Sequence, residues 1–574
     1  MFKQNNHFGF ARIVIGIAAM SLATQAQTWT YPGCPSVSDT DFTYTTLVQR
    51  GKAPDPELAE PDKMAFDMDD QGNVDVYFVE IRPGNIKRYN AATKTVKTLV
   101  KLPNWGLESD YLTVKLGVTE EGVTGIAMDP NFKTNHWVYI HWSPLPATLA
   151  VFRISRFTVT GDTILLSSEK IIMQFPAQRD ECCHTGGAMA FDAYGDLWIA
   201  QGPNGGRGTN TNTGNPPVGI DEVHKYDSEE WGATNTHGMR GGFLRIHPDN
   251  STKGYSIPAG NFGDYFFKQT GDSKYSDTSK VSPEVYIKGT RNNYSMSLDP
   301  VRRWVVWGDV GPDVMAGNVR EELNLRKTPG FEGWPYFVGN NTIFSGGKDP
   351  NAPTNTSKWN TGLTLLPPAR PAFKLHTLGT SPITGPIYRY DGDLQSKGKL
   401  PPHFNRKWFV TDWGSSVINV LTVDSLAEKV TTVQRIFGNH TFYGPVDFQA
   451  GPDGALYVVN YGPTLFGTGG STSIVKIEYK GSCSPSDPKL ETVPVVGIQN
   501  PGKDARADEW LVNLGSVRSL RVPNGMKGLQ AFSLTGKKVW EARRLHAGEI
   551  IGLPSDLPMG ALKYRWLSAA AAND

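Results

Sequence analysis

The chain carries six copies of one pattern of hydrophobic and polar positions. In each copy an apolar strand is followed by an Asp-containing turn and by a second strand rich in aromatic residues, which is typical of a β-hairpin. The first strands fall at 64–67, 125–130, 188–192, 295–300, 387–391 and 446–448, and the second strands at 76–78, 137–140, 196–199, 304–307, 408–410 and 456–459. A repeat of this kind predicts one structural unit per copy.

The spacing of the hairpins predicts an all-β, six-bladed β-propeller. The copies follow one another at about 65–70 residues, compared with roughly 40–45 for a minimal four-stranded blade, and a β-sandwich would lack so long a period. The additional residues form Gly-, Asn- and Pro-rich stretches such as 202–219 and 339–361, and long loops on a rigid ring are where binding sites are built. No Gly-rich dinucleotide fingerprint follows a strand and opens a helix, which argues against a nicotinamide-binding fold.

The propeller is expected to occupy residues 27–482, after an export signal at 1–26. Lys3 and Arg12 precede an apolar run of about ten residues and a small-residue end at 23–26. This run is too short to cross a bilayer, so it predicts a signal peptide and no membrane span, with a buried N-terminal helix as the alternative. The mature protein is therefore expected to be secreted, periplasmic or at the cell surface.

A linker at 483–503 leads to a small C-terminal β-sandwich module at 504–574. Strand-like segments fall at 517–522, 529–534, 539–540, 550–553 and 562–566. The run at 532–539 and the Gly-containing turns after it resemble the C-terminal sorting or anchoring modules of secreted bacterial proteins. This resemblance implies a partner in the cell surface or the secretion machinery, and an accessory carbohydrate-binding module is the alternative.

Charge and cysteine content narrow the class of partner. The chain of 574 residues has 57 Lys and Arg against 56 Asp and Glu, so no global field would attract nucleic acid or an anionic membrane. Its four cysteines fit an exported protein and allow three pairings. We expect Cys34 to pair with Cys483, which would tie the start of the first domain to its end. Cys182 and Cys183 would then form an adjacent-residue ring or remain thiols.

His184 is the candidate catalytic base. It stands directly before the third hairpin, in the sequence Glu-Cys-Cys-His-Thr-Gly-Gly at 181–187. The two glycines after it allow backbone and ligand to approach closely, and an imidazole accepts a proton near neutral pH. A single histidine is more often structural, so His184 gains weight only from the residues around it.

Further motifs follow in order along the chain. They are Gly-Val-Thr-Gly and Asp-Pro-Asn-Phe within 122–132, His-Thr-Gly-Gly at 184–187, Arg-Asn at 291–292, Gly-Pro at 311–312, Glu-Glu-Leu-Asn at 321–324, Gly-Trp-Pro-Tyr at 333–336 and Gly-Pro-Asp-Gly at 451–454. Together they cover about 112–462, and this series resembles the soluble glucose/sorbosone dehydrogenase family, the quinone-dependent sugar oxidases.

The resemblance implies oxidation of a sugar or polyol hydroxyl, with hydride transfer to pyrroloquinoline quinone. His184 would take the hydroxyl proton, and Arg291 would stabilise negative charge on the quinone oxygen, a task suited to a permanent cation. Asn292 would hydrogen-bond the edge of the cofactor, and Glu120 stands where the family has a cofactor-binding Gln.

The resemblance also implies a calcium ion that polarises the quinone. Its ligands would be the backbone carbonyls of Gly311 and Pro312. Asp309 and Asp313 flank this step and could add oxygen ligands, with ordinary surface turn residues as the alternative. Electrons would leave to a separate acceptor, because no Cys-x-x-Cys-His haem-attachment motif is present.

The sequence departs from the family at several charged positions. The carboxylate that usually pairs with the base would stand in a Gly-Asp step, which reads Gly202-Pro203 here. Basic residues expected near 414, 444 and 446 are replaced by Gly, Gly and Val. These cations would neutralise the carboxylates of the quinone, and Arg240 or Lys374 are candidates to replace them from another loop.

Two other functions stay open at this point. One is a non-catalytic propeller that binds glycan or protein, which the missing cations favour. The other is a propeller glycan hydrolase that uses Asp221-Glu222 and Glu229-Glu230 as its carboxylate pair, although charges in long loops are usually solvated. Trp334 and Tyr336 could stack on a sugar ring, although blade aromatics more often belong to the core.

Overall fold

The computed structural model describes most of residues 28–481, and the strands between 509 and 568. Within 28–481, the description leaves out 32–33, 108–119, 147, 180–182, 206–224, 227, 313–320, 347, 378, 425–426 and 465–468. The predicted signal peptide and Asp313 therefore lie outside the described residues.

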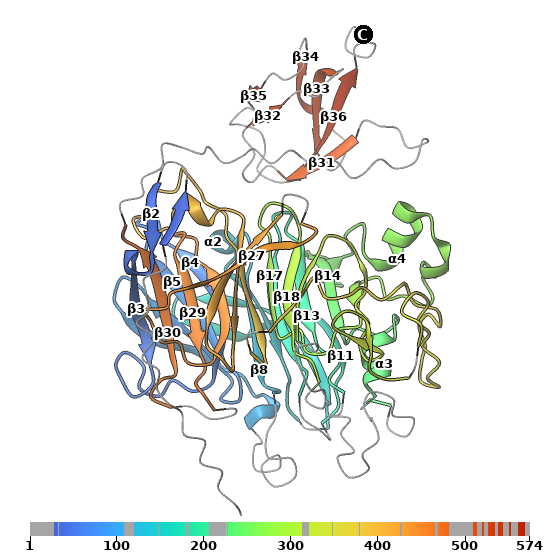
Figure 1. Ribbon diagram of the computed structural model, residues 1–574, viewed down its shortest axis with the longest axis horizontal. Helices are drawn as coiled ribbons and strands as arrows, with labels where there is room; N and C mark the ends of the chain where they lie inside the picture. Colours follow the sequence, from blue (N-terminus) through green and yellow to red (C-terminus); the bar gives the residue numbers. More distant parts are fainter. Residues whose placement is uncertain are drawn as a thin grey trace, which may run out of the picture.

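The described residues of the first domain form a six-bladed β-propeller, as predicted (Figure 1). Each blade contains four antiparallel strands, and the sheet of the third blade is extended by β15 and by β20, which pairs parallel with β16. The sixth blade is completed by a strand from the start of the domain. The blades consist of β4 (Pro61–Met68), β5 (Val74–Glu80), β6 (Asn85–Asn90) and β7 (Thr95–Lys101); β8 (Val123–Met128), β9 (Trp137–Trp142), β10 (Val151–Thr160) and β11 (Thr163–Pro176); β12 (Gly186–Phe191), β13 (Leu197–Gln201), β14 (Gly242–Pro248) and β16 (Val285–Lys288); β17 (Ser295–Leu298), β18 (Val305–Asp309), β19 (Glu322–Arg326) and β23 (Lys374–Leu375); β24 (Pro382–Ile387), β25 (Lys407–Asp412), β26 (Ile418–Val423) and β27 (Val430–Ile436); and β28 (Pro445–Ala450), β29 (Leu456–Asn460), β30 (Ser473–Tyr479) and β3 (Phe42–Gln49).

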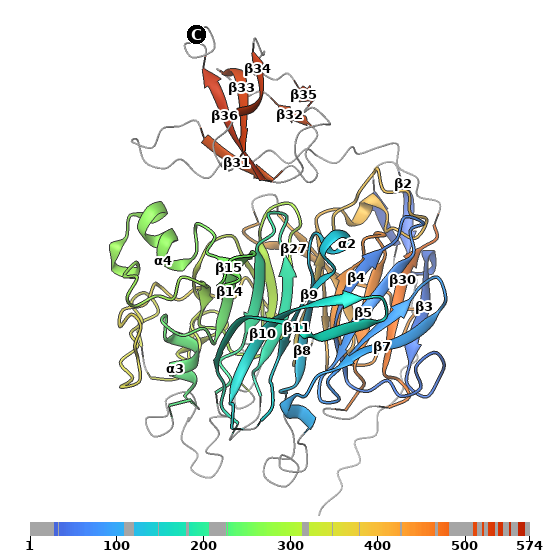
Figure 2. The ribbon, with the colours of Figure 1, turned by 180° about the vertical axis from the view of Figure 1, so that it is seen from behind.

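Short elements decorate the ring, mostly around the third and fourth blades (Figures 1 and 2). They are β1 (Thr28–Tyr31), β2 (Cys34–Ser38), η1 (Asp39–Asp41), η2 (Trp105–Leu107), α2 (Phe132–Asn135), α3 (Glu229–Thr234), β15 (Tyr255–Ser256), α4 (Phe262–Tyr265), η3 (Phe266–Thr270), η4 (Ser273–Tyr275), β20 (Gly330–Phe331), β21 (Phe337–Val338), β22 (Thr342–Ile343) and η5 (Pro402–Phe404). No helix among the described residues is both long and apolar enough to cross a membrane.

The repeated Asp and aromatic positions have a structural purpose inside the blades. In three blades the aromatic residue of the second strand donates a hydrogen bond to the Asp of the preceding turn, as Trp198 does to Asp192 over 3.1 Å. The same bond joins Tyr139 to Asp129 and Tyr457 to Asp453. Each large ring is thus buried with its polar atom satisfied, which makes this pair a stable choice for a blade core.

The fifth hairpin is the one place where the predicted strand is misplaced. The first strand, β24, ends at Ile387, whereas the pattern predicted a strand at 387–391. Tyr388 and Tyr390 are buried after the strand, and the Tyr388 hydroxyl donates to the Gly454 carbonyl of the sixth blade. The apolar pattern at 387–391 therefore reflects packing between blades and not strand pairing.

The C-terminal part is also built of strands. β31 (Glu509–Asn513), β36 (Ala561–Ser568), β33 (Met526–Ser533) and β34 (Lys538–Arg543) form one sheet, and β32 (Ser519–Arg521) pairs with β35 (Ile550–Gly552). All five predicted strand segments overlap one of these strands, which agrees with an all-β module.

Closure of the ring suggests a test at Phe42, which lies buried on β3 against two aromatic rings: Tyr479 of the sixth blade and Phe437, which follows the last strand of the fifth blade. We expect Phe42→Ala to lower the free energy of unfolding by about 3–5 kcal/mol, because it leaves a cavity at the seam. Urea titration followed by tryptophan fluorescence measures the change. Thr45→Ala, an exposed position on the same strand, is the control and should stay within about 0.5 kcal/mol of wild type. Equal effects of the two variants would contradict a seam held by this ring.

Candidate active site

The predicted site residues lie at one end of the propeller. Glu120, His184 and Arg291 each precede the first strand of a blade, while Gly311 follows the second strand of the fourth blade. First and second strands are antiparallel, as in the pairing of Gly186 with Gln201, so the start of one and the end of the other meet at the same end. Residues separated by about 190 positions in sequence are brought to one face of the ring.

His184 is held in an uncommon backbone conformation. Its φ is +58° and its side chain is only 6% exposed. The amide of Asn204 donates to the His184 carbonyl over 3.0 Å, and a Cβ at Gly202 would lie 2.0 Å from that same oxygen. Gly202 is therefore required for this close approach. A left-handed residue that its surroundings hold in place is a feature of functional sites.

The carboxylate missing from position 203 is supplied by another element. Nδ1 of His184 lies 2.9 Å from Oε1 of Glu229, the first residue of helix α3, and both side chains are buried. The expectation that the Glu229-Glu230 pair is solvated is wrong, because the Tyr336 hydroxyl also donates to Glu230 over 2.5 Å. Sequence reasoning missed Glu229 as a partner of His184 because the two residues are 45 positions apart.

Glu120 lies beside the His184 loop. Its Oε2 accepts a long hydrogen bond of 3.4 Å from the Thr185 amide, and its carbonyl accepts one of equal length from the Thr185 hydroxyl. The structure thus places Glu120 beside the base, because Glu120 contacts Thr185, the residue that follows His184.

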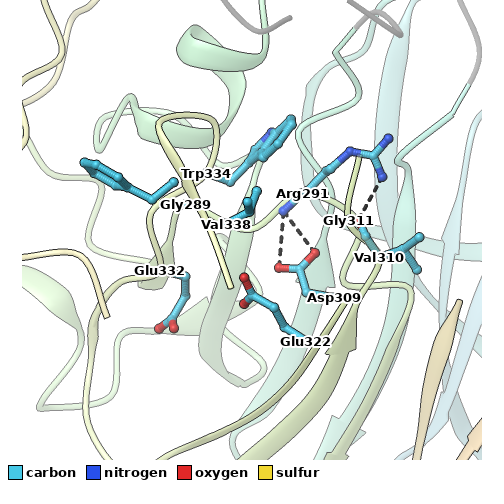
Figure 3. Close-up of a pocket in the computed structure, with 10 residues that line it drawn as sticks. Gly289, Arg291, Asp309, Val310, Gly311, Glu322, Glu332, Trp334 and Val338 are labelled. Carbon is cyan, nitrogen blue, oxygen red and sulfur yellow. Dashed lines mark hydrogen bonds between the residues drawn. The ribbon is translucent and has the colours of Figure 1, made fainter. Parts of the chain in front are cut away.

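Arg291 and Asn292 are oriented by a buried carboxylate. The Arg291 amide donates to Asp309 over 3.1 Å, and its guanidinium donates to the Val310 carbonyl over 2.7 Å (Figure 3). The Asn292 amide also donates to Asp309, over 2.7 Å. Burial raises the pKa of Asp309 to about 6, while the two amide hydrogen bonds oppose the rise. The oxygens of Asp309 are thus engaged in shaping the turn.

The Gly311-Pro312 step is buried directly after β18. The Gly311 amide donates to Oε2 of Glu321 over 3.0 Å, so the acidic motif at 321–322 supports the Gly-Pro element. The described residues include no cluster of three or more His, Cys, Asp or Glu side chains that could hold a metal ion.

Trp334 connects the two halves of the site. Its indole Nε1 donates to Oε2 of Glu229 over 2.8 Å, and its ring lies 5.5 Å from the guanidinium carbon of Arg291. Trp334 and Tyr336 are buried, so they belong to the packed support and are not exposed platforms for a sugar ring. A continuous set of contacts thus runs from His184 through Glu229 and Trp334 to Arg291.

A small cavity of about 10 Å³ lies beneath Arg291, roughly the room of one water molecule. Arg291, Asp309, Glu322 and Trp334 line it (Figure 3). Burial, with the nearby Asp309 as a second cause, raises the pKa of Glu322 to about 8. Glu322 is therefore largely protonated at neutral pH, which lets it lie close to Asp309.

At one of the positions that lack the expected cation, the backbone leaves no room for a side chain. Gly444 has a φ of +57°, and a Cβ there would lie 2.1 Å from the Gly462 carbonyl oxygen, so the local fold excludes any side chain. A cation reaches the neighbouring position from the first blade instead: Nζ of Lys63 donates to the Val446 carbonyl over 3.2 Å and lies 3.8 Å from the centre of the Tyr294 ring. Sequence reasoning did not identify Lys63.

Arg240 and Lys374, the two residues suggested to replace the missing cations, lie in different parts of the propeller. The Arg240 guanidinium lies over the Trp231 ring at 4.7 Å and donates to the Tyr226 carbonyl. Lys374 lies on the outermost strand of the fourth blade, β23.

Cys183, the residue before His184, is disulfide-bonded and has a φ of +95°. The side chains of Cys34, Cys182 and Cys483 are not among those described, so the predicted pairing stays a prediction.

Comparison with known proteins agrees with the predicted resemblance. The sequence model of the glucose/sorbosone dehydrogenase family matches residues 58–220, which include Glu120 and His184. No curated protein matches the chain.

Solved structures similar to this chain are sugar dehydrogenases by their descriptions. The apo-form of the soluble aldose sugar dehydrogenase of Escherichia coli has a TM-score of 0.50 and 18% identity, covering 76% of this chain and 99% of its own. An oxidoreductase of Thermus thermophilus, described as a glucose dehydrogenase, has a TM-score of 0.49 and 19% identity over 76% and 99% of the two chains. The PQQ-bound aldose sugar dehydrogenase of Streptomyces coelicolor has a TM-score of 0.45 and 15% identity over 76% and 98%. At this level of identity the first of these likenesses supports the propeller fold alone.

The raised pKa of Glu322 predicts a specific pH dependence of stability. Its pKa is about 8 in the folded protein and roughly 4.3 in the unfolded chain. Between these values the unfolded chain releases the proton first, so stability falls as pH rises. We expect Glu322→Gln, which cannot ionise, to gain on the order of 3 kcal/mol relative to wild type between pH 5 and pH 8.

Thermal unfolding of both proteins across this pH range measures the difference. A glutamine at 322 places its NH₂ group against another donor, either the Asn324 amide or the Gly339 N–H. This cost does not depend on pH, so only the pH slope of stability is compared. The exposed Glu428→Gln serves as the matched control and should leave the slope unchanged. Parallel pH profiles for wild type and Glu322→Gln would contradict a buried, protonated Glu322.

Proposed function

We propose that this protein is an exported oxidoreductase that oxidises a hydroxyl of a sugar or polyol by hydride transfer to pyrroloquinoline quinone. The observation that carries the proposal is the connected set of His184, Glu229, Trp334 and Arg291 at one end of the propeller. This set joins His184, a base whose Nδ1 is hydrogen-bonded to Glu229, to the permanent cation of Arg291. Such an oxidation needs both a base and a cation. Because the sequence resembles sugar dehydrogenases, this arrangement favours catalysis over a purely binding propeller.

The residues at the Arg291 side fit a quinone. Nε of Arg291 and Oδ1 of Asn292 are buried and have no hydrogen-bond partner in the described part of the chain. A buried donor and a buried acceptor without partners are each costly, and a ligand that offers both kinds of group would remove these costs. When bound, pyrroloquinoline quinone supplies the two-electron acceptor that amino-acid side chains lack.

His184 is suited to accept the hydroxyl proton. Its Nδ1 is committed to Glu229, and among the described residues nothing bonds its Nε2. A neutral imidazole with its proton on Nδ1 leaves the lone pair of Nε2 free, which is the form a general base requires. Transfer of this proton to Nε2 would let the hydroxyl-bearing carbon give up its hydride to the bound two-electron acceptor, and the product would be a carbonyl compound or lactone.

Arg291 would stabilise negative charge that develops on the acceptor. Its guanidinium is fixed by the Val310 carbonyl and faces the Trp334 ring, so little rotamer freedom is lost when it binds an anion. Asn292 and Glu120 would contact the edge of the cofactor. Lys63 is the cation we assign to one of its carboxylates, in place of the basic residue that position 446 lacks.

Calcium would be held by the backbone carbonyls of Gly311 and Pro312 together with the cofactor, and Asp313 stays a candidate ligand. Calcium accepts six to eight oxygen ligands in flexible geometry, which suits a site with few protein donors. The electrons would pass to a separate carrier outside the cytoplasm.

The direct test is titration of the purified full chain with pyrroloquinoline quinone and calcium, followed by dye reduction over a panel of sugars. We expect saturable changes in quinone absorbance and sugar-dependent dye reduction. His184→Ala should lower kcat by about 100-fold or more, which is the usual contribution of a general base. Arg291→Ala should lower it by a similar factor, because a charge-stabilising donor is lost.

His136→Asn is the matched control. His136 is exposed on the turn of the second blade hairpin, at the opposite end of the strands, and asparagine tolerates its φ of +57°. This variant should keep full activity. Folded protein that binds no quinone would overturn the proposal and leave a glycan- or protein-binding propeller as the better account.

A further inference from the structure

Glu229 accepts one hydrogen bond at each carboxylate oxygen. His184 Nδ1 lies 2.9 Å from Oε1, and Trp334 Nε1 donates to Oε2 over 2.8 Å. All three side chains are buried, and Glu229 is fully so. A carboxylate can accept from two donors in this way, whereas an amide of the same shape offers one oxygen and one donor group.

We infer that Glu229 is the shared positioning residue of the site, fixing His184 as the base and, through Trp334, the surroundings of Arg291. From helix α3, Glu229 replaces the carboxylate that position 203, a proline, does not provide. Through Trp334 it also reaches the Arg291 side of the site. This role rests on the proposed function. Glu229 itself contacts neither substrate nor cofactor in this scheme.

The place of Glu229 is determined by the third blade. The Ser228 hydroxyl oxygen caps α3 by accepting from the Trp231 amide over 3.2 Å. The buried Lys288, at the end of β16, donates from Nζ to the Gly232 carbonyl over 3.1 Å, and the Gly289 amide donates to the Ala233 carbonyl over 2.9 Å. A helix of six residues has little stability alone, so these bonds to the blade hold it.

The effect of Glu229 on His184 is a choice of tautomer. An acceptor at Nδ1 keeps the proton there and leaves Nε2 as the base. In Glu229→Gln the indole of Trp334, which can only donate, takes the amide oxygen. The amide NH₂ then faces His184, whose Nδ1 must accept, so the proton moves to Nε2 and the base is lost.

The experiment is ¹⁵N NMR of imidazole-labelled full chain, with His184→Asn used to assign the signal. Wild type should show the Nδ1–H tautomer at His184, and Glu229→Gln the Nε2–H tautomer. With quinone, calcium and sugar, Glu229→Gln should lower kcat at least tenfold with little change in KM, as expected for loss of an orienting partner.

A second substitution separates positioning from simple loss of charge. Trp334→Phe removes the indole donor, so in the Glu229→Gln/Trp334→Phe double variant the amide oxygen is free for His184. We expect the Nδ1–H tautomer to return and kcat to recover about tenfold over Glu229→Gln alone. Tyr336→Phe, which deletes the hydrogen bond to the neighbouring Glu230, is the control and should leave the tautomer unchanged.

An Nδ1–H tautomer that persists in Glu229→Gln, or one that fails to return in the double variant, would overturn the inference. The NMR readout needs neither cofactor nor turnover. A tautomer change without quinone-dependent activity would therefore reject the proposed function and keep the role of Glu229, whereas activity without the tautomer change would do the reverse.

Discussion

The pairing of β3 with β30 is the constraint on which the rest of the structure depends. It joins residues 42–49 to residues 473–479, so the sixth blade exists only when both ends of the domain meet. Closing the ring completes the sixth blade and keeps the six inner strands in contact with one another. The site depends on this closure. Its residues come from the first, second, third, fourth and sixth blades, which are far apart in the sequence and meet only in the closed ring.

The propeller could be predicted from the sequence because its repeat is a chemical unit. An Asp and an aromatic residue that share a hydrogen bond must recur at fixed places in a hairpin, and Trp198 with Asp192 shows why. The pattern predicted a strand at 387–391 that does not form. The tyrosines there are buried because the fifth and sixth blades pack against each other. Periodicity reports burial, and it cannot say which neighbour buries a residue.

The candidate site was predictable only where its residues lie next to strand boundaries. His184, Arg291 and Asn292 have this property, so their motifs could be recognised. Glu229 and Lys63 do not have this property. Glu229 lies on a short helix inside a long insertion, and Lys63 of the first blade donates to a carbonyl of the sixth blade. Two signals were nevertheless present in the sequence. Pro203 stands where the carboxylate partner of His184 was expected, so the partner had to come from elsewhere. Ser228 is a typical N-cap residue, and two glutamates follow it directly.

Two departures from the family pattern, at Gly444 and Pro203, are accompanied by a charged group that comes from another part of the chain. At Gly444 the backbone lies so close to Gly462 that no side chain fits, so a cation in that region must come from another blade. Position 203 provides no carboxylate, and the buried imidazole of His184 still needs an acceptor. Glu229 of α3 is that acceptor. A buried charge is tolerated only when it is paired. Each relocated group therefore brings its own support: Asp62 lies beside Lys63, and Trp334 and His184 lie on the two oxygens of Glu229. In this protein the charges around the site are consequently coupled to packing in distant parts of the chain.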